Sequence, residues 1–201
     1  MAPRLVLASA SPARLRLLRE AGFDPDVAVS GVDEAAAIAE LGPGAVPTDV
    51  VEELAVRKAA AVASIVPDAL VVGCDSMLEL DGEVLGRPRD DADAAARWRH
   101  RRGREARLLT GHAVVDGGSG RRLSAVVATV VRFGRPTDAE IDAYVATGEP
   151  LEVAGGFTLL GRSAPFVDGI DGDPGNVIGL SLPALRRLLA ELGIEVTSLW
   201  R

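Results

Sequence analysis

With 201 residues and a formal net charge of −7, the chain is long enough for one large domain or two small ones and has no overall attraction for nucleic acid or anionic membranes. Its one cysteine, Cys74, excludes an intramolecular disulfide and a cysteine-rich zinc site, and its two histidines, His100 and His112, do not favour a histidine-based metal site. Any bound metal is therefore expected to be a hard cation on carboxylate and phosphate oxygens. No apolar run can span a bilayer and the first residues lack the order of a signal peptide, which predicts a cytoplasmic protein.

The N-terminal part of the chain predicts strands alternating with helices. Apolar runs indicate short strands at residues 5–8 and 27–29. Ser11 is placed to cap a helix over residues 12–21, whose first residue is proline. After a connection rich in glycine and proline, apolar residues at helical spacing predict a helix over residues 48–66.

The rest of the chain adds a hairpin, longer strands and further helices. We expect strands at 69–75, 107–115 and 122–133, a hairpin turn at Asp81–Gly82, a helix that begins near Asp90 or Asp91, helices over 137–146 and 181–192, and a turn-rich loop at 172–180. Strands and helices that intermix in this way predict an α/β or α+β fold on a mixed sheet. Because no linker forces a boundary, residues 1–201 are expected to form a single domain.

The first strand runs directly into the turn "ASASPARLR", which carries hydroxyls and arginines. A strand that opens into a helix presents free backbone N–H groups and the positive end of the helix dipole. Ser9 and Ser11 add hydroxyl donors, and Arg14 adds a guanidinium suited to phosphate. The turn therefore predicts an anion site; the alternative is that Ser11 only caps the helix and the arginines are solvated.

Two ionisable residues stand out within apolar segments. Asp75 ends the apolar strand "VVGCD", where the ligands of α/β sheets collect, and can hold a divalent cation or act as a base. The alternative is a turn residue that caps the next segment. Lys58 lies in the apolar stripe of the helix over 48–66, so its ammonium either extends to solvent or points at a site.

Other polar residues have weaker signals. Arg87 and Arg89 can reach phosphate, with solvation as the alternative that we prefer for Arg89, and Glu34 either pairs with a basic group or metal or is a surface charge. The run "RWRHRRGREAR" around Trp98 resembles a nucleic-acid surface, but a solvated helix end suits an acidic protein better. Nucleic acid is therefore not expected as a partner, and Cys74 is expected to be a buried strand residue.

Six blocks of the sequence, taken in order, resemble one known family. They are "LASASPARLRLL", "GVDE", "LAVRKA", "VVGCDSMLELDGEVLGRPRD", "TGEPLEVAGGF" and "IDGDPGNVIGLSLP". In order and spacing they look like the Maf family of nucleoside triphosphate pyrophosphatases, over nearly the whole chain.

The resemblance implies an α/β fold with an extended mixed sheet flanked by helices and two lobes with a cleft between them, often as a homodimer. It implies cleavage of a nucleoside triphosphate between the α- and β-phosphates, which releases a monophosphate and pyrophosphate. It also implies a divalent cation, Mg²⁺ or Mn²⁺, and for some members the removal of non-canonical nucleotides.

Matched position by position, the resemblance makes Asp75 the catalytic aspartate and a candidate metal ligand. It assigns phosphate and substrate binding to Ser9, Ser11, Arg14, Glu34, Lys58 and Arg87. Position 87 is lysine in most members, and arginine keeps the charge but changes its shape.

Three positions depart from the family pattern. Ala13 stands where an arginine is frequent, Ser76 where a threonine follows the aspartate, and Leu160 where a polar residue can read the base. The resemblance associates these positions with the choice of base, so phosphate chemistry transfers more safely than substrate identity. Neither the thymidine/uridine type nor the methylated-guanosine type is matched at them.

The expected mechanism is in-line attack of water on the α-phosphorus. Asp75 orients or deprotonates the water, directly or through the metal, and Arg14, Lys58 and Arg87 offset the charge of the phosphates. Two alternatives remain. One is a nucleotide-binding regulator with weak or no catalysis, which Ala13 and Leu160 suggest, and the other is an RNA-binding module.

Overall fold

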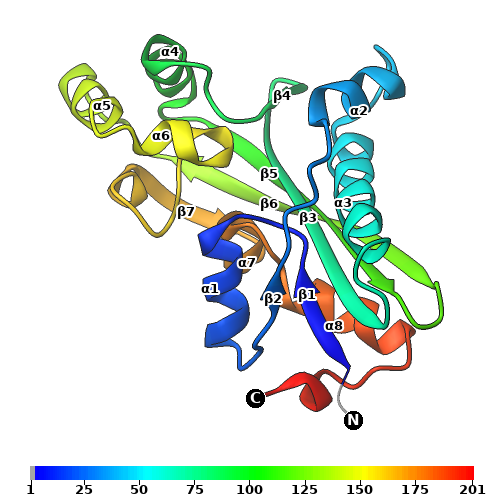
Figure 1. Ribbon diagram of the computed structural model, residues 1–201. Helices are drawn as coiled ribbons and strands as arrows, with labels where there is room; N and C mark the ends of the chain where they lie inside the picture. Colours follow the sequence, from blue (N-terminus) through cyan, green and yellow to red (C-terminus); the bar gives the residue numbers. More distant parts are fainter. Residues whose placement is uncertain (1–2) are drawn as a thin grey trace. The chain divides into compact units, whose positions relative to one another are not determined.

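Residues 3–201, which the computed structural model describes, form a mixed seven-stranded sheet with helices against it (Figure 1). The strand order is β2-β1-β3-β5-β6-β7, and β4 pairs with β3. β1 runs parallel to β2 and β3, whereas β4 and β7 run antiparallel to β3 and β6. The predicted α/β class with a mixed sheet flanked by helices is confirmed.

The strands are β1 (Arg4–Leu7), β2 (Asp26–Val27), β3 (Ala69–Leu80), β4 (Glu83–Leu85), β5 (Glu105–Asp116), β6 (Arg122–Phe133) and β7 (Val167–Asp171). The helices are α1 (Pro12–Glu20), α2 (Glu34–Leu41), α3 (Pro47–Ala63), α4 (Asp91–Arg101), α5 (Asp138–Val145), α6 (Glu149–Glu152), α7 (Pro174–Ile178) and α8 (Leu182–Glu191). Short 3₁₀ turns are η1 (Ala154–Gly156), η2 (Ala164–Phe166) and η3 (Val196–Leu199).

The chain divides into two units. Unit 1 takes the chain up to Asp75, together with Thr110–Val127 and Gly179–Arg201, and unit 2 takes Ser76–Leu109 and Ala128–Ile178. Each apolar cluster of the described residues draws on one unit, so each unit has a core of its own. The single domain expected over residues 1–201 stays a prediction.

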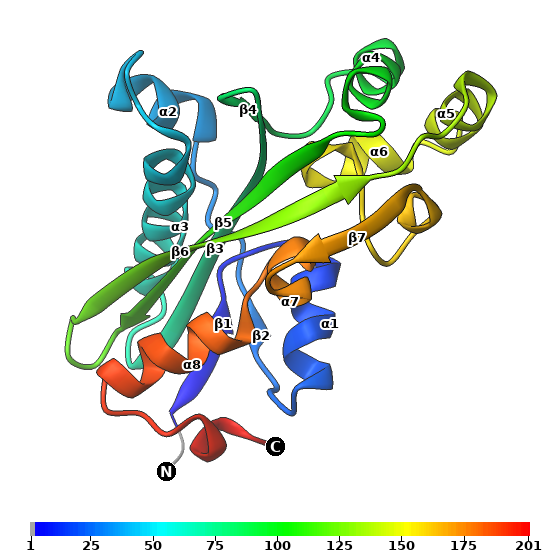
Figure 2. The ribbon, with the colours of Figure 1, turned by 180° about the vertical axis from the view of Figure 1, so that it is seen from behind.

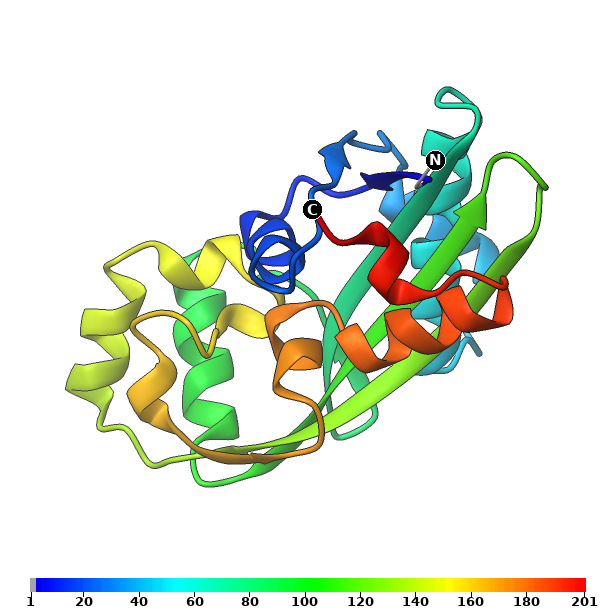
Figure 3. The same cartoon turned by 90° about the horizontal axis from the view of Figure 1, so that it is seen from below.

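Unit 1 has helices on both faces of its strands. Successive side chains of a strand point to opposite faces, which explains why β1 and β3 are apolar without alternation. Leu7 and Val72 pack with α1 and α8, while Val6 and Val71 pack with α3. Figures 2 and 3 show α3 and α8 on opposite sides of β1 and β3. Helices therefore cover both faces of these strands and shield them from solvent.

Helix α3 lies directly on the sheet where β3 and β5 carry glycine. A Cβ at Gly73 would overlap the carbonyl oxygen of Ala55 and lie 2.8 Å from the nitrogen of Ala59. A Cβ at Gly111 would overlap the backbone of Val51. The two glycines thus allow the backbone of α3 to approach β3 and β5 closely. This short distance determines how far the side chains of α3 extend toward the strands.

Unit 2 packs α4 and α5 against its strands. Leu78, Leu108 and Val131, from β3, β5 and β6, share a core with Trp98 of α4 and Ile141 of α5. The Trp98 ring is fully buried and makes edge-to-face contacts with three aromatic rings of this core. Figure 1 shows α4 and α5 side by side.

Local signals predicted several element ends correctly. The hydroxyl of Ser11 accepts a hydrogen bond from the first turn of α1. Thr137 and Glu140 form the expected capping box at the start of α5. Asp81 and Gly82 form the turn between β3 and β4 with φ of 57° and 81°, as the Asp-Gly pair predicts.

Two predictions about β3 and the loop at 172–180 are wrong. Asp75 does not end a strand, because β3 continues without a turn residue to Leu80 and pairs with β4 over Leu78–Leu80. The loop contains the short helix α7, which starts at Pro174. A single helical turn has too few residues to show an apolar period, so the sequence gives no helical signal there.

Three further element positions differ from the prediction. α2 was not expected, because its alanines give no marked apolar face. α3 starts at Pro47 rather than Thr48, since proline is favoured at the first helical position. β2 covers Asp26–Val27 rather than 27–29, because its partner β1 ends at Leu7.

Replacement of Gly73 tests the close packing of α3 on β3. We expect Gly73→Ala to lower the free energy of unfolding by about 1–3 kcal/mol, the usual range for overpacking, because the new methyl meets helix backbone that cannot rotate away. Urea unfolding followed by circular dichroism measures it. Gly44→Ala is the matched control, since a Cβ there meets no atom within 4 Å. Equal stability of the two variants would contradict the packing.

Candidate active site

Asp75 lies in β3 on the face covered by α3, where Lys58 meets it. The Lys58 Nζ is 2.5 Å from the Asp75 Oδ1, and only 11% and 9% of the two side chains are exposed. The close approach of α3 at Gly73 brings the amine to this depth. Of the two roles expected for Lys58, the structure shows the second: the ammonium points at a buried carboxylate and does not extend to solvent.

Glu34 reaches the same ammonium from α2. Its Oε1 lies 2.6 Å from the Lys58 Nζ, and its side chain is 51% exposed. The Asp33 carboxylate caps α2 by accepting from the Ala36 N–H at 3.0 Å, which places Glu34 at the first helical position. Glu34 therefore pairs with a basic group, and Lys58 lies between two carboxylates.

Burial raises the pKa of the Asp75 carboxyl above its ordinary value. The charges of Lys58 and Arg14 oppose this rise, and the charge of Glu34 adds to it. The second oxygen, Asp75 Oδ2, is buried and accepts no hydrogen bond from residues 3–201. A buried carboxylate oxygen without a partner is unfavourable, so Oδ2 is the atom available to a proton, a water or a cation.

The turn after β1 holds Arg14 in a defined position. Its Nε donates to the carbonyl oxygen of Gly179 at 2.8 Å, and its Nη1 donates to the Ser9 Oγ at 3.0 Å. The Ser11 Oγ accepts from the Arg14 N–H at 3.4 Å. Ser11 is therefore a cap, and the same turn groups a guanidinium, hydroxyls and the positive end of α1, which suits an anion.

Unit 1 contains most of the predicted substrate-binding residues. The turn gathers Ser9, Ser11 and Arg14, and one ion-paired cluster gathers Glu34, Lys58 and Asp75. The Arg14 charge acts on the Asp75 carboxyl, so the turn and the cluster form one electrostatic group. Ala13 lies half-buried in the first turn of α1.

The remaining predicted residues belong to unit 2. Ser76 follows Asp75 in β3, and its side chain points to the opposite face of the strand. Arg87 is exposed after β4, and Leu160 is 52% exposed after η1. Arg89 is also exposed and pairs with Asp93 at 3.5 Å, which agrees with the solvated role preferred for it.

Buried side chains hold η1, the segment that precedes Leu160 in the chain. Arg101 of α4 is 1% exposed, and its guanidinium lies 4.1 Å from the centroid of the Trp98 ring. Arg101 donates to the carbonyl of Gly155, and the Trp98 Nε1 donates to the carbonyl of Gly156 at 2.9 Å. Burial lowers the pKa of Arg101 to about 9, so it still carries its charge at pH 7. Leu160 thus follows a segment fixed from within the core.

The arginine-rich run around Trp98 does not form a stacking surface. Trp98 is fully buried, whereas single-stranded nucleic acids stack on exposed aromatic rings. Arg99, Arg102 and Arg104 each pair with an aspartate of unit 2 at 2.5–2.7 Å. The RNA-binding alternative therefore gains no support from this part of the molecule.

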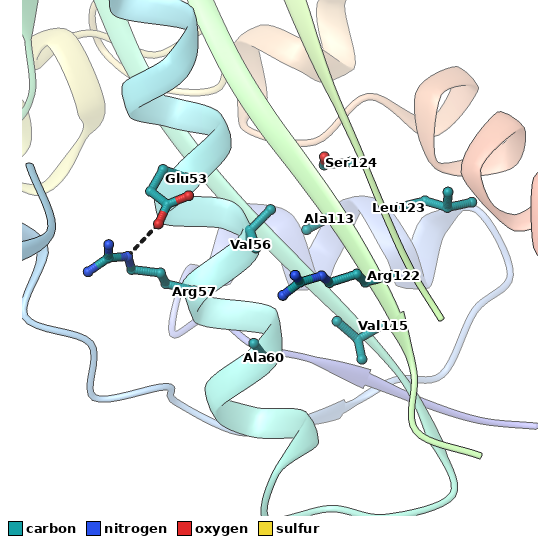
Figure 4. A pocket seen from close by; sticks show the side chains of 9 residues that line it. All are labelled: Glu53, Val56, Arg57, Ala60, Ala113, Val115, Arg122, Leu123 and Ser124. Atoms are coloured by element: carbon teal, nitrogen blue, oxygen red, sulfur yellow. Dashed lines mark hydrogen bonds and ion pairs between the residues drawn. The ribbon is translucent and has the colours of Figure 1, made fainter. Parts of the chain in front are cut away.

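Two hollows of unit 1 contain none of the predicted site residues. One of about 460 Å³ lies between α3 and the adjoining parts of β5 and β6, with Glu53, Arg57, Arg122 and Ser124 in its polar lining (Figure 4). Arg57 is already paired with Glu53 at 2.7 Å. The other, of about 450 Å³, lies beside the end of α8. The size of these hollows alone does not identify a ligand for either of them.

Sequence reasoning missed two glycines on which the site depends. Gly179 orients Arg14 through its carbonyl and has φ of 124°, a conformation open to glycine. Gly73 allows Lys58 to reach Asp75. The available signals were a glycine inside an apolar strand, which indicates a close backbone approach, and a glycine shortly before the cap of α8.

The acidic residues of the cluster suit a hard cation that takes most of its ligands from elsewhere. Within residues 3–201 no three His, Cys, Asp or Glu side chains gather into a metal cluster. Mg²⁺ is commonly held by one or two carboxylates, with waters and substrate phosphates as its other ligands. Asp75, through its unpartnered Oδ2, and Glu34 have the donor chemistry for that arrangement.

Comparison with known proteins shows the family of this chain. The family described as "Maf-like protein" matches residues 4–192. A protein of Streptomyces coelicolor named "Nucleoside triphosphate pyrophosphatase" is 62% identical over 199 residues, which cover 98% of this chain and 94% of that protein. Proteins of the same name are 60% identical in Streptomyces avermitilis, over 98% of this chain and 94% of the relative, and 52% identical in Mycobacterium sp. (strain JLS), over 100% and 99%. The chain belongs to the Maf family.

The electrostatics of the cluster predict how Asp75 titrates. In the metal-free protein we expect a pKa above the ordinary value of about 3.9, because burial disfavours the charge. Lys58→Met should raise this pKa further, because it removes the ammonium that lowers it. Carboxyl ¹³C shifts followed by NMR across pH measure both values. A wild-type pKa at or below 3.9, or a lower value in Lys58→Met, would show that burial is not the dominant cause.

Proposed function

We propose that this protein hydrolyses nucleoside triphosphates to the monophosphate and pyrophosphate. The relatives at 52–62% identity carry the name of this activity and match the chain over almost its full length. The observation that carries the proposal is the buried Asp75: its carboxylate has one oxygen on Lys58 and the other without a partner, within the electrostatic reach of Arg14.

Each candidate catalytic or phosphate-binding residue of unit 1 has a definable task in this reaction. Water attacks the α-phosphorus, the new P–O bond forms as the bond to the bridging oxygen breaks, and pyrophosphate leaves. The Asp75 Oδ2 accepts the proton of the attacking water, for which its raised pKa is an advantage. Arg14 and Lys58 offset the negative charge that grows on the departing oxygens. Ser9 and Ser11 orient phosphate oxygens at the start of α1.

A divalent cation, Mg²⁺ or Mn²⁺, is part of the proposal as a cofactor that Glu34 and the substrate phosphates would hold, with Asp75 as a further candidate ligand. If the cation took Asp75 Oδ2, this oxygen would orient the attacking water through the cation instead of accepting its proton. When bound it supplies charge neutralisation and Lewis acidity at the phosphate oxygens. Of unit 2, the proposal assigns a phosphate contact to Arg87, whose planar guanidinium can bind two oxygens at once. No ion pair among residues 3–201 occupies the Arg87 side chain.

A pyrophosphate-release assay across standard and modified triphosphates tests the proposal. We expect release of pyrophosphate and monophosphate with added Mg²⁺ or Mn²⁺ and loss of activity with a chelator. Release of orthophosphate instead would mean attack on the γ-phosphorus and would contradict the proposed bond. Tight nucleotide binding without any release would support the alternative of a nucleotide-binding regulator.

Replacement of Asp75, the proposed general base, is the most direct mutational test. Asp75→Asn keeps the size of the side chain but cannot accept the proton, so turnover should fall at least about a hundredfold, the usual scale for acid–base groups. Folding should be preserved, as circular dichroism can check. Asp24→Asn, an exposed aspartate of unit 1, is the matched control and should keep full activity. Turnover near that of the wild type in folded Asp75→Asn would remove Asp75 from the mechanism.

Leu160 bears on which nucleobase of the substrate is accepted. Leu160 is an exposed apolar side chain next to a segment fixed by Arg101 and Trp98. An apolar group discriminates between bases by shape, at only about 1–3 kcal/mol, because it leaves no polar group unpaired when the base is wrong. We therefore propose a broad substrate range that includes modified or bulky bases, as the removal of non-canonical nucleotides requires.

A polar residue at position 160 should narrow this range. We expect Leu160→Gln to retain activity on some nucleotides and to lose it on others, measured as kcat/KM across a nucleotide panel. Ile65→Gln, which changes another exposed aliphatic residue, is the control and should leave the range unchanged. A wild-type preference for one base above roughly a thousandfold would reveal polar readout by other residues.

The expected partners and location stay predictions. No helix among residues 3–201 has the length and apolar character to cross a membrane. The homodimer is open to measurement by sedimentation, and the cytoplasmic location by fractionation of cells.

A further inference from the structure

His112 is a buried histidine of unit 1 that the proposed mechanism does not use. It lies in β5, is 1% exposed, and its Nε2 accepts the N–H of Ser181 at 2.8 Å. Its neighbours Ala113 and Val114 pack with α3 and with the α1/α8 core respectively, so alternation places His112 on the side of α8. The ring is thus directed at the start of α8.

This hydrogen bond defines the state of the ring. An N–H donor can bond to Nε2 only if that nitrogen has its lone pair free, so the imidazole is neutral and carries its proton on Nδ1. The Ser181 hydroxyl does a different task, since it accepts from the Ala184 N–H at 3.1 Å and caps α8. His112 therefore serves the backbone of Ser181 rather than its side chain.

The backbone that His112 holds leads directly to Arg14. Leu180, between Gly179 and Ser181, is fully buried in the same core, so these three residues form one fixed segment. At its start, the Gly179 carbonyl accepts the Arg14 Nε at 2.8 Å. A Cβ at Gly179 would lie 3.1 Å from that nitrogen, which shows how closely the segment fits against the guanidinium.

We propose that His112 is a positioning residue for the phosphate-binding arginine: through the Ser181 amide it fixes the Gly179 carbonyl that aims Arg14 toward Ser9. The Arg14 guanidinium has several rotatable bonds, and only an acceptor at a fixed place selects one orientation before substrate arrives. Without an acceptor for its buried N–H, Ser181 would shift toward other partners or water and carry the Gly179 carbonyl with it. The inference rests on the proposed role of Arg14 in binding phosphate.

A double-mutant cycle separates positioning from general stability. We expect Arg14→Met to lower kcat/KM by about ten- to a hundredfold, the range of a charged hydrogen bond, and His112→Phe to lower it by about tenfold. The double variant should lie within about twofold of Arg14→Met alone, because His112 acts through Arg14. Effects that multiply would mean that the two residues act independently, and would overturn the proposal.

Two further variants define what the ring contributes. His112→Gln offers an amide oxygen to the Ser181 N–H and should recover most of the activity that His112→Phe loses. His100→Phe changes the exposed histidine of unit 2 and is the matched control, with no expected effect. If His112→Gln is as impaired as His112→Phe while both are folded, the hydrogen bond is not the cause and the proposal fails.

Two measurements that do not depend on catalytic activity test the proposal. In the wild-type protein, ¹⁵N shifts of His112 at pH 7 should report the neutral tautomer with its proton on Nδ1, and the other tautomer or an imidazolium would overturn the hydrogen bond. Calorimetry with inorganic pyrophosphate should show weaker binding to both Arg14→Met and His112→Phe, again without additivity. Pyrophosphate binding that follows this cycle, in a protein that hydrolyses no triphosphate, would refute the proposed function but support the role of His112. No pyrophosphate binding by the wild type would refute that role.

Discussion

The ion pair between Lys58 and Asp75 exists because α3 lies almost in backbone contact with β3, and the candidate site is arranged around this pair. A buried carboxylate or ammonium loses several kcal/mol of hydration, which a partner at 2.5 Å can offset only when the geometry is held firmly. The missing side chain at Gly73 supplies that geometry. The pair neutralises one oxygen of Asp75 and leaves the other, Oδ2, in a dry place, where a general base is most effective.

The two units hold their candidate residues in different ways. In unit 1 the charged groups project from a strand, from helices and from a capped helix start, so the sheet and its helices fix their positions. In unit 2, Arg87 and Leu160 lie on connecting segments, and the hydrogen bonds from Arg101 and Trp98 fix Gly155 and Gly156, which precede Leu160 in the chain. Charged groups on rigid elements suit a common phosphate chemistry, whereas side chains on turns can change between relatives without loss of the core.

Much of the secondary structure and the choice of candidate residues could be predicted from sequence, because both depend on local chemistry. The Ser11 cap, the Asp81–Gly82 turn and the lysine in an apolar stripe are short-range patterns with a physical cause. Asp75 is a buried carboxylate of a strand, as the sequence predicts, but it does not end that strand, since β3 continues to Leu80. A polar pair inside a strand resembles a strand end until the neighbouring strands are known.

Length, charge, caps and apolar periods, together with the ordered motifs, determined the α/β class, the resemblance to the Maf family and the candidate residues. Only the tertiary structure decided which of these meet: that Lys58 contacts both Asp75 and Glu34, that Gly179 holds Arg14, and that Trp98 is buried. The physical reason is that each of these contacts joins residues far apart in the chain. Whether they form depends on how closely helices and strands approach, which sequence spacing does not encode.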